Sequence, residues 1–535
     1  MVDPTLGHDA RQKEAKYFPY AEKTDTLGKR IGLKVRDNIV TIIVVLFIAV
    51  GLYASEGLSV SFFVNELLAR IFRNGFLILA LIIPVVAGLG LNFGIVAGAL
   101  AGMLATIFIR YHAGLECAAC LALIEEAGAF AAADPCAAWP GCLPWAGLGG
   151  VSGLMICFIL SLPIALLIGY LTGKLYNKTR GQEMIASLIV GFFANGVYWV
   201  IALILVGTLI PVDPNHVMII PGGIGIVSTI DMGWHPAQRL FDPEWDRVGL
   251  SYALDWIWRV PFGPALTALG VGILAFIVIK DLRAKKNPAI SGYKRWVFIV
   301  YCVICAIVIL LGLQIWLIPA GGIVILFPVF LQGIARGVMI PGSFLSGVRE
   351  IPAVTGFVII GIGLFIHYFL KTKLGQDCRS AGQSQHIANV SGINVDRTRV
   401  IATMISTVLA AWGMIIWMQN IGTINTYGAH MNIGIFAVAS LLVGGATSSR
   451  ANVKNAMIGV VLFNAMFIVS PEIGRLIAPN NANVGEYTRS TMVYGIIGLS
   501  LGLHVWKANK IAKEQNKLED VVPSRVESGE RKEES

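Results

Sequence analysis

Four cysteines lie close together in the first third of the chain. Cys117 and Cys120 form a Cys-x-x-Cys pair, and Cys136 and Cys142 follow at irregular spacing. Such a set can form disulfides, bind zinc or remain as free thiols. The surrounding residues 111–150 contain no Lys or Arg, which predicts a location outside the cell membrane. Because the exterior is oxidising, we expect disulfides in preference to a metal site.

A second group of residues has the chemistry to bind a neutral polar solute. The long apolar runs of the sequence contain Asn92, Asn195 and Asn464, and they also contain Phe93 and Phe436. Amide side chains can hydrogen-bond to hydroxyl groups, and aromatic rings can stack on a sugar or a base. Each amide can equally be a contact between two helices. We take these five residues as candidates for a solute path.

Nothing in the sequence indicates a reaction catalysed by this chain. There is no G-x-x-x-x-G-K-[ST] phosphate loop, the eight His form no metal-like cluster, and no Ser/His/Asp or paired-carboxylate set stands out. We therefore predict a protein that is not an enzyme, holds no cofactor or metal, and does not hydrolyse ATP itself. Charged residues are nearly absent from the predicted spans. This argues against coupling to protons or sodium, because ion-coupled transporters usually carry ionisable residues there.

The composition shows which elements position these residues. The chain has 535 residues, of which 56% are hydrophobic and only 14% charged, whereas soluble proteins contain about 25% charged residues. Most of the chain must therefore be solvated by lipid. The net charge of +9 does not indicate nucleic-acid binding, because the Lys and Arg lie in short loops beside apolar runs. We predict an all-α, polytopic membrane protein.

The alternation of apolar runs and basic loops predicts about twelve transmembrane helices with both termini cytoplasmic. We expect a discontinuous helix near Asn92, where glycines are frequent, and an interfacial segment over residues 55–73. The run 74–110 is long enough for two crossings, or for one broken helix and another. The expected regions are a basic tail (1–37), the transmembrane domain (38–506) with outer loops (111–150, 211–262) and a cytoplasmic loop (371–399), and a charged tail (507–535).

The most informative stretch is the cytoplasmic loop 371–399, a polar and basic segment between two apolar runs. Residues 387–390 are predicted to form a short helix, and Gly392 is a plausible stop because Gly accepts the left-handed cap conformation. A short helix between two spans can dock into a groove on another protein. An ordinary hydrophilic loop is the alternative.

This loop resembles the cytoplasmic loop of bacterial ABC-importer permeases of the ribose/simple-sugar, nucleoside and branched-chain amino acid group. The matching residues are Arg379, Ala381-Gly382, Ala388 and Ser391-Gly392-Ile393-Asn394-Val395. The chain departs from the pattern at Ser384, where the family has Asn, and at Ile387, where it has the first of two alanines. The resemblance extends over residues 74–210 and 353–506, and the apolar pair 263–279 and 296–318 is predicted to be an insertion.

The resemblance implies that the loop couples the permease to separate ATPase subunits that bind the ATP. The implied coupling residues are Arg379, Gly382, Ile387, Ala388, Val390, Gly392, Ile393 and Asn394. Gly382 would allow the loop to bend, and Ile387, Val390 and Ile393 would fill a groove on the ATPase.

The further implied partners are a second permease subunit, identical or different, and an extracytoplasmic solute-binding protein. The implied location is the inner membrane, and the implied solute is a sugar or a nucleoside. The alternatives are an ion-coupled transporter or channel that needs no ATPase, and a non-transporting membrane scaffold or enzyme.

Overall fold

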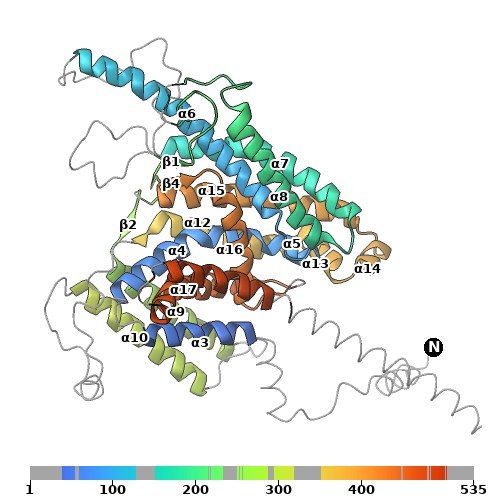
Figure 1. The fold of residues 1–535 in the computed structure, drawn as a ribbon. Coiled ribbons are helices and arrows are strands. Elements are labelled where there is room, and N and C mark those ends of the chain that lie inside the picture. Colours follow the sequence, from blue (N-terminus) through green and yellow to red (C-terminus); the bar gives the residue numbers. More distant parts are fainter. Residues whose placement is uncertain are drawn as a thin grey trace, which may run out of the picture.

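A computed structural model describes residues 39–54, 60–127, 151–232, 250–286, 295–317, 351–478 and 481–502, apart from 215, 217, 252, 256, 448–449, 482 and 500–501. Helices dominate this part of the chain (Figure 1). The helices are α3 (Ile39–Ala54), α4 (Val60–Ala80), α5 (Ile82–Val86), α6 (Ile95–Ala127), α7 (Val151–Lys178), α8 (Glu183–Val200), the π-helical turn η1 (Ile201–Leu205), α9 (Phe262–Lys286), α10 (Arg295–Leu317), α12 (Ala353–Phe369), α13 (Lys373–Gln383), α14 (Gln385–Val390), α15 (Val395–Ile421), α16 (Ala429–Val443) and α17 (Val453–Ile477).

The helices are those of a multi-pass membrane protein. Within the described residues, seven helical segments are long and apolar enough to cross a membrane, or eight if the bent pair α12–α13 is one span. Three shorter apolar helices are also present, in α3, α10 and α16. The predicted helical membrane protein is thus confirmed, whereas the predicted twelve spans are not. Both chain ends lie outside the described residues.

Helix α15 is the centre of the bundle. Its 27 residues extend about 40 Å at 1.5 Å per residue, which is more than a bilayer core requires. It is buried along most of its length and packs against α4, α5, α6, α7 and α13. The Asn394 side chain caps its first turn, and Gly422, with φ of +79°, ends it in the left-handed conformation.

Two Gly-x-x-x-Gly pairs bring the neighbouring helices close to α15. A Cβ atom on Gly98 or Gly102 of α6 would lie 2.7 or 2.2 Å from a backbone oxygen of α15. On α7, a Cβ on Gly169 or Gly173 would lie 2.8 or 2.9 Å from an α15 Cα atom. Lipid gives helices no hydrophobic reason to associate, so close backbone packing by small residues has to hold them together.

The chain is not helical between Val86 and Ile95, as expected near Asn92. Gly88 and Gly90 have φ of +77° and +71° there. However, the break separates two candidate spans, 62–86 and 95–112. The prediction of one discontinuous helix is therefore wrong, and the alternative of two crossings agrees with the structure. The expected interfacial segment 55–73 is also wrong from Val60 onward, because α4 begins there and is continuous.

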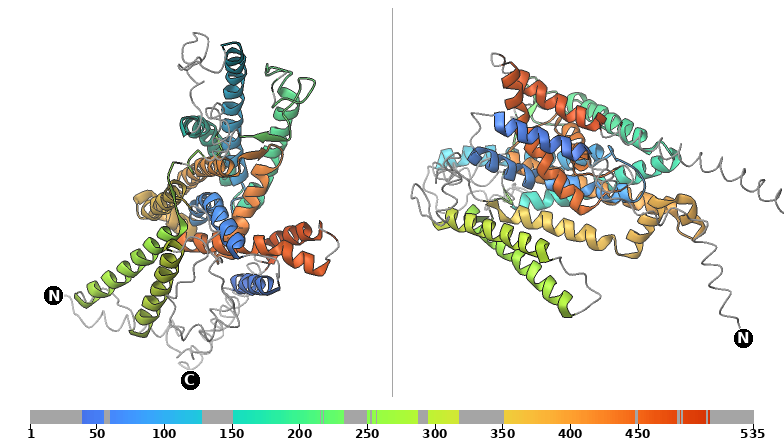
Figure 2. Two further views of the ribbon diagram at one scale, coloured as in Figure 1. Left: turned by 90° about the vertical axis from the view of Figure 1, so that its left-hand side faces the viewer. Right: turned by 90° about the horizontal axis from the view of Figure 1, so that it is seen from below.

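Helices α9 and α10 form an antiparallel hairpin that projects to one side of the bundle (Figure 2). Each packs mainly against the other. A pair that leaves the packing of α15 untouched can be inserted without disturbing the core. The insertion itself stays a prediction.

The predicted outer loop 211–262 is pinned to the bundle by strand pairs and a buried carboxylate. Strand β1 (Thr229–Asp231) pairs antiparallel with β4 (Thr423–Asn425), and β2 (Arg259–Val260) pairs with β3 (Ile351–Pro352).

Asp255, between β1 and β2, is 3% exposed. Its carboxylate accepts hydrogen bonds from Thr355 Oγ1, from Gln419 Nε2 at 3.1 Å and from Asn420 Nδ2 at 2.6 Å. This network joins the loop to the ends of α12 and α15.

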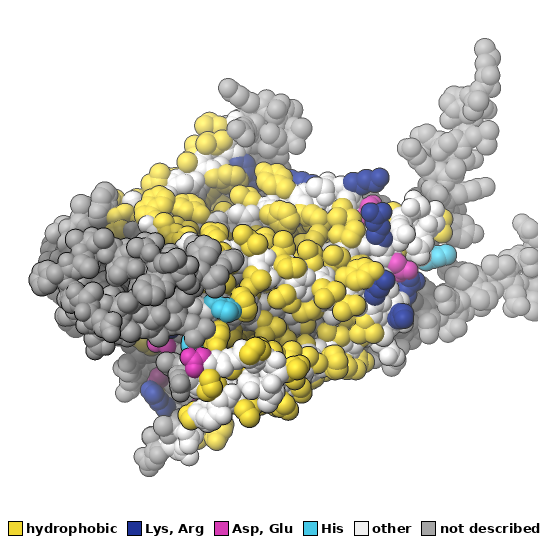
Figure 3. Space-filling model, turned by 90° about the horizontal axis from the view of Figure 1, so that it is seen from above, with side chains coloured by type: hydrophobic (Ala, Val, Ile, Leu, Met, Phe, Trp, Pro, Cys, Tyr) yellow, Lys and Arg dark blue, Asp and Glu magenta, His cyan; other side chains and the backbone are white. Residues whose placement is uncertain are grey.

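The surface divides into an apolar belt and a basic end. Figure 3 shows hydrophobic side chains over the middle of the molecule, with Lys and Arg gathered at the end that carries α13 and α14 in Figure 1. We call this the basic end. The strand pairs and Asp255 lie at the opposite end.

We expect the Asp255→Ala variant to be less stable by about 3 kcal/mol. Hydrogen bonds to a charged group contribute about 1.5–3 kcal/mol each, and three donors would be left without their acceptor. The measurement is thermal unfolding of the purified protein in detergent. The control is Glu472→Ala, which removes an exposed pair with Arg475 that should contribute below about 1 kcal/mol. Equal melting temperatures for the two variants would contradict the role of Asp255.

Candidate functional site

The segment 371–399 is an ordered helix–turn–helix between two spans. Helix α12 bends by 74° into α13, and α14 follows after a single residue, Ser384. Ser384 ends α13 and caps α14, where its Oγ accepts a hydrogen bond from the Ile387 amide at 3.4 Å. Ser and Asn are comparably good at this position. The departure from the family pattern at Ser384 therefore keeps the local structure.

The predicted short helix and its stop are confirmed. Helix α14 covers the expected residues 387–390, and Gly392 has φ of +81°. The Ile393 amide donates to the Ala388 carbonyl at 3.0 Å, as in left-handed helix caps. The Asn394 Oδ1 then accepts from the Arg397 amide at 3.0 Å and begins α15.

Helix α14 has a buried side and an exposed apolar side. Ala388 packs against Ala381 and Val395, which holds the six-residue helix in place. Ile387 and Val390 are 66% and 77% exposed, and Arg379 on α13 is also exposed. Ile393, in contrast, packs on the buried cluster. Ile393 is therefore only partly buried within the chain, and its contact with a partner's groove stays a prediction.

Gly382 has a different role from the one predicted. It lies inside α13, and the chain changes direction at Ser384. A Cβ on Gly382 would lie 2.1 Å from the Val86 carbonyl oxygen and 3.0 Å from the Gly88 amide nitrogen. Gly382 is thus required for close packing of α13 on the break between α5 and α6, and the prediction that it provides the bend is wrong.

Polar contacts join the start of α15 to the α7–α8 turn at the basic end. Arg399 is fully buried, and its Nη2 lies 2.5 Å from Glu183 Oε1 at the start of α8. Its Nε and Nη1 have no hydrogen-bond partner in the described part of the chain. The Arg180 guanidinium forms an ion pair with the Asp396 carboxylate. The side-chain Nδ2 of Asn177 donates a hydrogen bond to the backbone carbonyl of Asp396 at 2.9 Å.

Sequence reasoning missed the pairing of Glu183 with Arg399. The available signal was a carboxylate and a guanidinium each placed within the first five residues of an apolar helix.

Two of the solute-path candidates lie at the basic end. Asn92 is 2% exposed, and its Oδ1 accepts hydrogen bonds from the Gly94 amide and the Tyr176 hydroxyl, both at 2.9 Å. The Phe93 amide donates to Ser187 Oγ at 3.1 Å, and its ring is buried. Both residues therefore hold the α5–α6 break against α7 and α8. These contacts support the structural alternative for Asn92.

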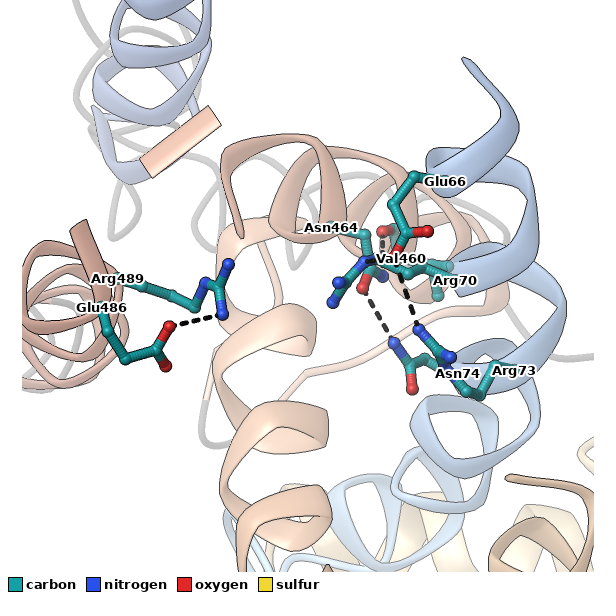
Figure 4. A network of polar contacts seen from close by, with 8 residues as sticks. All are labelled: Glu66, Arg70, Arg73, Asn74, Val460, Asn464, Glu486 and Arg489. Atoms are coloured by element: carbon teal, nitrogen blue, oxygen red, sulfur yellow. Dashed lines mark hydrogen bonds and ion pairs between the residues drawn. The ribbon is translucent and has the colours of Figure 1, made fainter. Parts of the chain in front are cut away.

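The other candidates lie elsewhere. Asn464 Oδ1 accepts a hydrogen bond from Asn74 Nδ2 at 2.8 Å (Figure 4). Asn464 and Phe436 line one small cavity, which Asn92, Phe93 and Asn195 do not line. Asn195, on α8, has a buried Oδ1 with no partner in the described part of the chain. The structure therefore places the five candidates in three separate locations: Asn92 with Phe93, Asn464 with Phe436, and Asn195 by itself.

Charged residues do occur inside the spans, which corrects an expectation from the sequence. Glu66, Arg70 and Arg73 lie within the span 62–86, and Figure 4 shows them beside the Asn74–Asn464 contact. Arg70 Nε lies 2.7 Å from Glu66 Oε1. The buried Arg399–Glu183 pair also belongs to two candidate spans. Glu66, Arg70 and Arg73 were not expected in a span, because the sequence analysis assigned residues 55–73 to an interfacial segment.

The cysteine predictions mostly lie outside the described residues. Cys136 and Cys142 fall there, and Cys117 and Cys120 lie in α6, with side chains that are not described. Within the described residues, no group of three His, Cys, Asp or Glu could hold a metal ion.

Cys378 of α13 is expected to react slowly with thiol reagents. Burial, with a smaller effect of the Asp377 carboxylate, raises its pKa to about 11. The reactive thiolate is then scarce at neutral pH, and alkylation should accelerate about tenfold per pH unit until the pH approaches that value. We expect Gly382→Ala to displace α13 and speed alkylation at pH 7.4 at least fivefold. The measurement is site-resolved mass spectrometry after N-ethylmaleimide treatment.

The matched control is Gly392→Ala, which strains a left-handed residue in open space and leaves α13 in place. If both variants alkylate Cys378 at the wild-type rate, α13 does not depend on close packing at Gly382.

We expect Glu183→Gln to destabilise the protein by about 3–5 kcal/mol, because it leaves the Arg399 guanidinium buried without a counter-charge. The double variant Glu183→Leu, Arg399→Met should recover most of this loss, since removing both charges removes the desolvation cost. Thermal unfolding of the three proteins distinguishes these outcomes. A double variant as unstable as Glu183→Gln would show that the charges themselves are not the cause.

Comparison with known proteins points to transport. Residues 248–501 match the family described as "Branched-chain amino acid transport system / permease component". This region begins before β2 and includes the whole α12–α15 segment. No solved structure matches the chain.

Several curated relatives match shorter segments. The high-affinity branched-chain amino acid transport system permease protein LivH of Salmonella typhimurium is 29% identical over 138 residues, which are 24% of this chain and 42% of LivH. LivH of Escherichia coli K12 is 30% identical over 106 residues, 20% of this chain and 32% of LivH. The probable ABC transporter permease protein YphD of Escherichia coli K12 is 28% identical over 123 residues, 23% of this chain and 36% of YphD.

The chain thus spans about a third to two-fifths of the length of these relatives. The matched proteins are transport subunits by name. The family description and the names of these relatives are those of permease components, and none of them names a sugar or a nucleoside.

Proposed function

We propose that this chain is the transmembrane permease subunit of an ATP-driven importer, and that separate ATPase subunits dock on α14. The observation that carries this proposal is the exposure of Ile387 and Val390 on a helix that is already folded and capped. Large apolar side chains at a polar, basic end mark an interaction site. A pre-ordered helix also loses little conformational freedom when it enters a partner's groove.

The contacts around α13 and α14 provide a route for force into the bundle. Gly382 of α13 lies against the backbone at Val86 and Gly88, so a push on α14 reaches the α5–α6 break directly. Through Arg399 and Glu183 the same movement reaches α8. Movement driven by ATP on the partner subunits would then change the access of the spans from outside to inside.

The other proposed partners are assigned according to the two ends of the molecule. By the positive-inside rule the basic end would face the cytoplasm and the loop 211–262 would lie outside. The membrane would be the inner membrane, as the resemblance of the loop 371–399 implies. An extracytoplasmic solute-binding protein would dock at that outer end. A second permease subunit, identical or different, would complete the path, and the chain itself would bind no cofactor.

Two solute classes compete within this proposal. The loop resemblance favours a sugar or a nucleoside, whereas LivH is named as a branched-chain amino acid permease. Competition of unlabelled ribose, adenosine and leucine with uptake of each labelled solute separates the classes, because only the transported class inhibits its own uptake at low concentration.

One observation favours the alternative function, an ion-coupled transporter that works without ATPase subunits. Glu66, Arg70 and Arg73 lie inside a span, where ionisable residues often serve coupling. Uptake that collapses with a protonophore but persists without ATPase subunits would favour this alternative.

We expect Ile387→Asp and Val390→Asp to reduce ATP-dependent uptake at least thirtyfold. A buried interface contact of this kind contributes about 2 kcal/mol or more, and a carboxylate cannot enter an apolar groove without a partner. The measurement is uptake into proteoliposomes that contain the chain, the partner ATPase subunits and the solute-binding protein. Co-purification of the ATPase should fall in parallel.

The matched control is Asn389→Asp, which adds the same charge to an exposed position on the same helix. It should retain most of the uptake. Wild-type transport by all three variants would exclude α14 as the docking element.

A further inference from the structure

Residues 110–112 of α6 hold the loop that follows η1. The Tyr111 hydroxyl accepts a hydrogen bond from the Asp213 amide at 2.8 Å, and the Tyr111 ring lies 4.5 Å from the His216 ring. The neighbouring Arg110 Nε donates to the Asp231 carbonyl at 3.0 Å, near the end of the same loop. Tyr111 is therefore the point on α6 to which the beginning of the loop is attached. We call the described residues between 211 and 219 the His216 loop.

The imidazole of His216 also organises the backbone of this loop. Its Nδ1 accepts a hydrogen bond from the Met218 amide at 3.1 Å, and the His216 carbonyl accepts one from the Ile219 amide at 2.9 Å. An imidazole nitrogen accepts a hydrogen bond only while it carries no proton. A proton on Nδ1 would direct one N–H group at another, and the amide of Met218, a residue that is 5% exposed, would lose its acceptor. The observed loop conformation therefore requires the neutral imidazole.

The surroundings of His216 also disfavour the protonated ring. Burial has the largest effect and, together with the Arg110 guanidinium, lowers the pKa of His216 from its ordinary value of 6.5. The Asp213 carboxylate and a hydrogen bond with the Tyr111 backbone raise this pKa and are outweighed. A second imidazole, that of His112, lies 5.4 Å from the Tyr111 ring. In a released loop the His216 ring would regain its ordinary pKa, so the attachment is strongest above pH 6.5 and weakens as the pH falls below it.

The His216 loop forms part of the wall of an apolar cavity. The cavity lies between α6, α7 and α8, has a volume of about 360 Å³ and is also lined by Tyr198. Met218 and Ile219 line it from the loop, and Tyr111 lines it from α6. A loop released from Tyr111 would therefore remove one wall of the cavity.

We propose that His216 is a pH-sensitive latch: the neutral imidazole holds the His216 loop on α6 beside the cavity, and protonation releases the loop. Histidine suits this role, because its charge changes between about pH 5 and pH 8. Acidification at this end of the molecule would then open the cavity. The latch depends only on contacts between α6 and the loop, so it goes beyond the proposed transport function and needs neither ATP nor a partner subunit.

The experiment is hydrogen–deuterium exchange of the full chain in lipid nanodiscs at pH 7.5 and pH 5.0, read by mass spectrometry. Each rate is corrected for the intrinsic pH dependence of amide exchange. Peptides that cover the His216 loop report the latch, and peptides from the middle of α15 report the whole bundle. The test variant is His216→Asn, whose side-chain oxygen can accept the Met218 amide at both pH values and cannot be charged. The matched control is His112→Asn, which removes the other imidazole beside Tyr111.

We expect the protection of the loop amides in the unmodified chain to fall about fivefold or more between pH 7.5 and pH 5.0, while α15 stays protected. His112→Asn should show the same fall. His216→Asn should show no pH dependence, whatever its absolute protection.

Three results would overturn the proposal: equal loop protection at both pH values in the unmodified chain, a fall of the same size in His216→Asn, or loss of the pH effect in His112→Asn. A parallel fall in α15 would also contradict a local latch, because it indicates unfolding of the bundle. If His216→Asn does not fold, the unmodified chain and His112→Asn still decide between these outcomes.

Discussion

The close approach of α6 and α7 to the backbone of α15 is the constraint on which the rest of the structure depends. Side chains gain nothing by leaving lipid for a protein interior of similar polarity, so helix association needs contact area at short distance. The glycine pairs at 98 and 102 and at 169 and 173 provide it on two sides of α15. A methyl group at any of them would meet backbone atoms, which cannot move aside as a flexible side chain can.

Helix α15, held in this way, is also fixed by polar contacts at both of its ends. At the end opposite the basic end Asp255 binds Gln419 and Asn420, and at the basic end Arg399 binds Glu183. One helix is therefore tied to the outer loop and to the α7–α8 turn. In the proposed importer, a partner at either end would act on the same rigid element. Docking outside and ATP-driven movement inside would then be mechanically connected.

Helix α14, the cavity beside Tyr198 and the polar cluster of Figure 4 lie in different places relative to the packed helices around α15. Helix α14 lies outside them, and its exposed apolar residues have no structural use within the described chain. The cavity beside Tyr198 lies between α6, α7 and α8, where the π-helical turn interrupts regular packing. The polar cluster of Figure 4 joins α4 to α17, away from both.

The sequence by itself determined the membrane class, the basic end, and the short helix over residues 387–390 with its stop at Gly392. These features depend on composition and on neighbouring residues: apolar runs, Lys and Arg in loops, and the left-handed Gly392. Local interactions of this kind act over a few residues and can be read directly from the order of amino acids.

Tertiary structure decided what depends on partners distant in the sequence. Nothing local distinguishes Gly382, which must meet Val86, from a glycine that permits a bend. Likewise, Asn92 and Asn464 look alike in the sequence, yet one caps a chain break and the other bonds to Asn74. The span limits of α4 were also misjudged, because charges that are paired inside a bundle resemble charges that face water. Only the three-dimensional contacts settle such cases, since burial and pairing are properties of the packed helices.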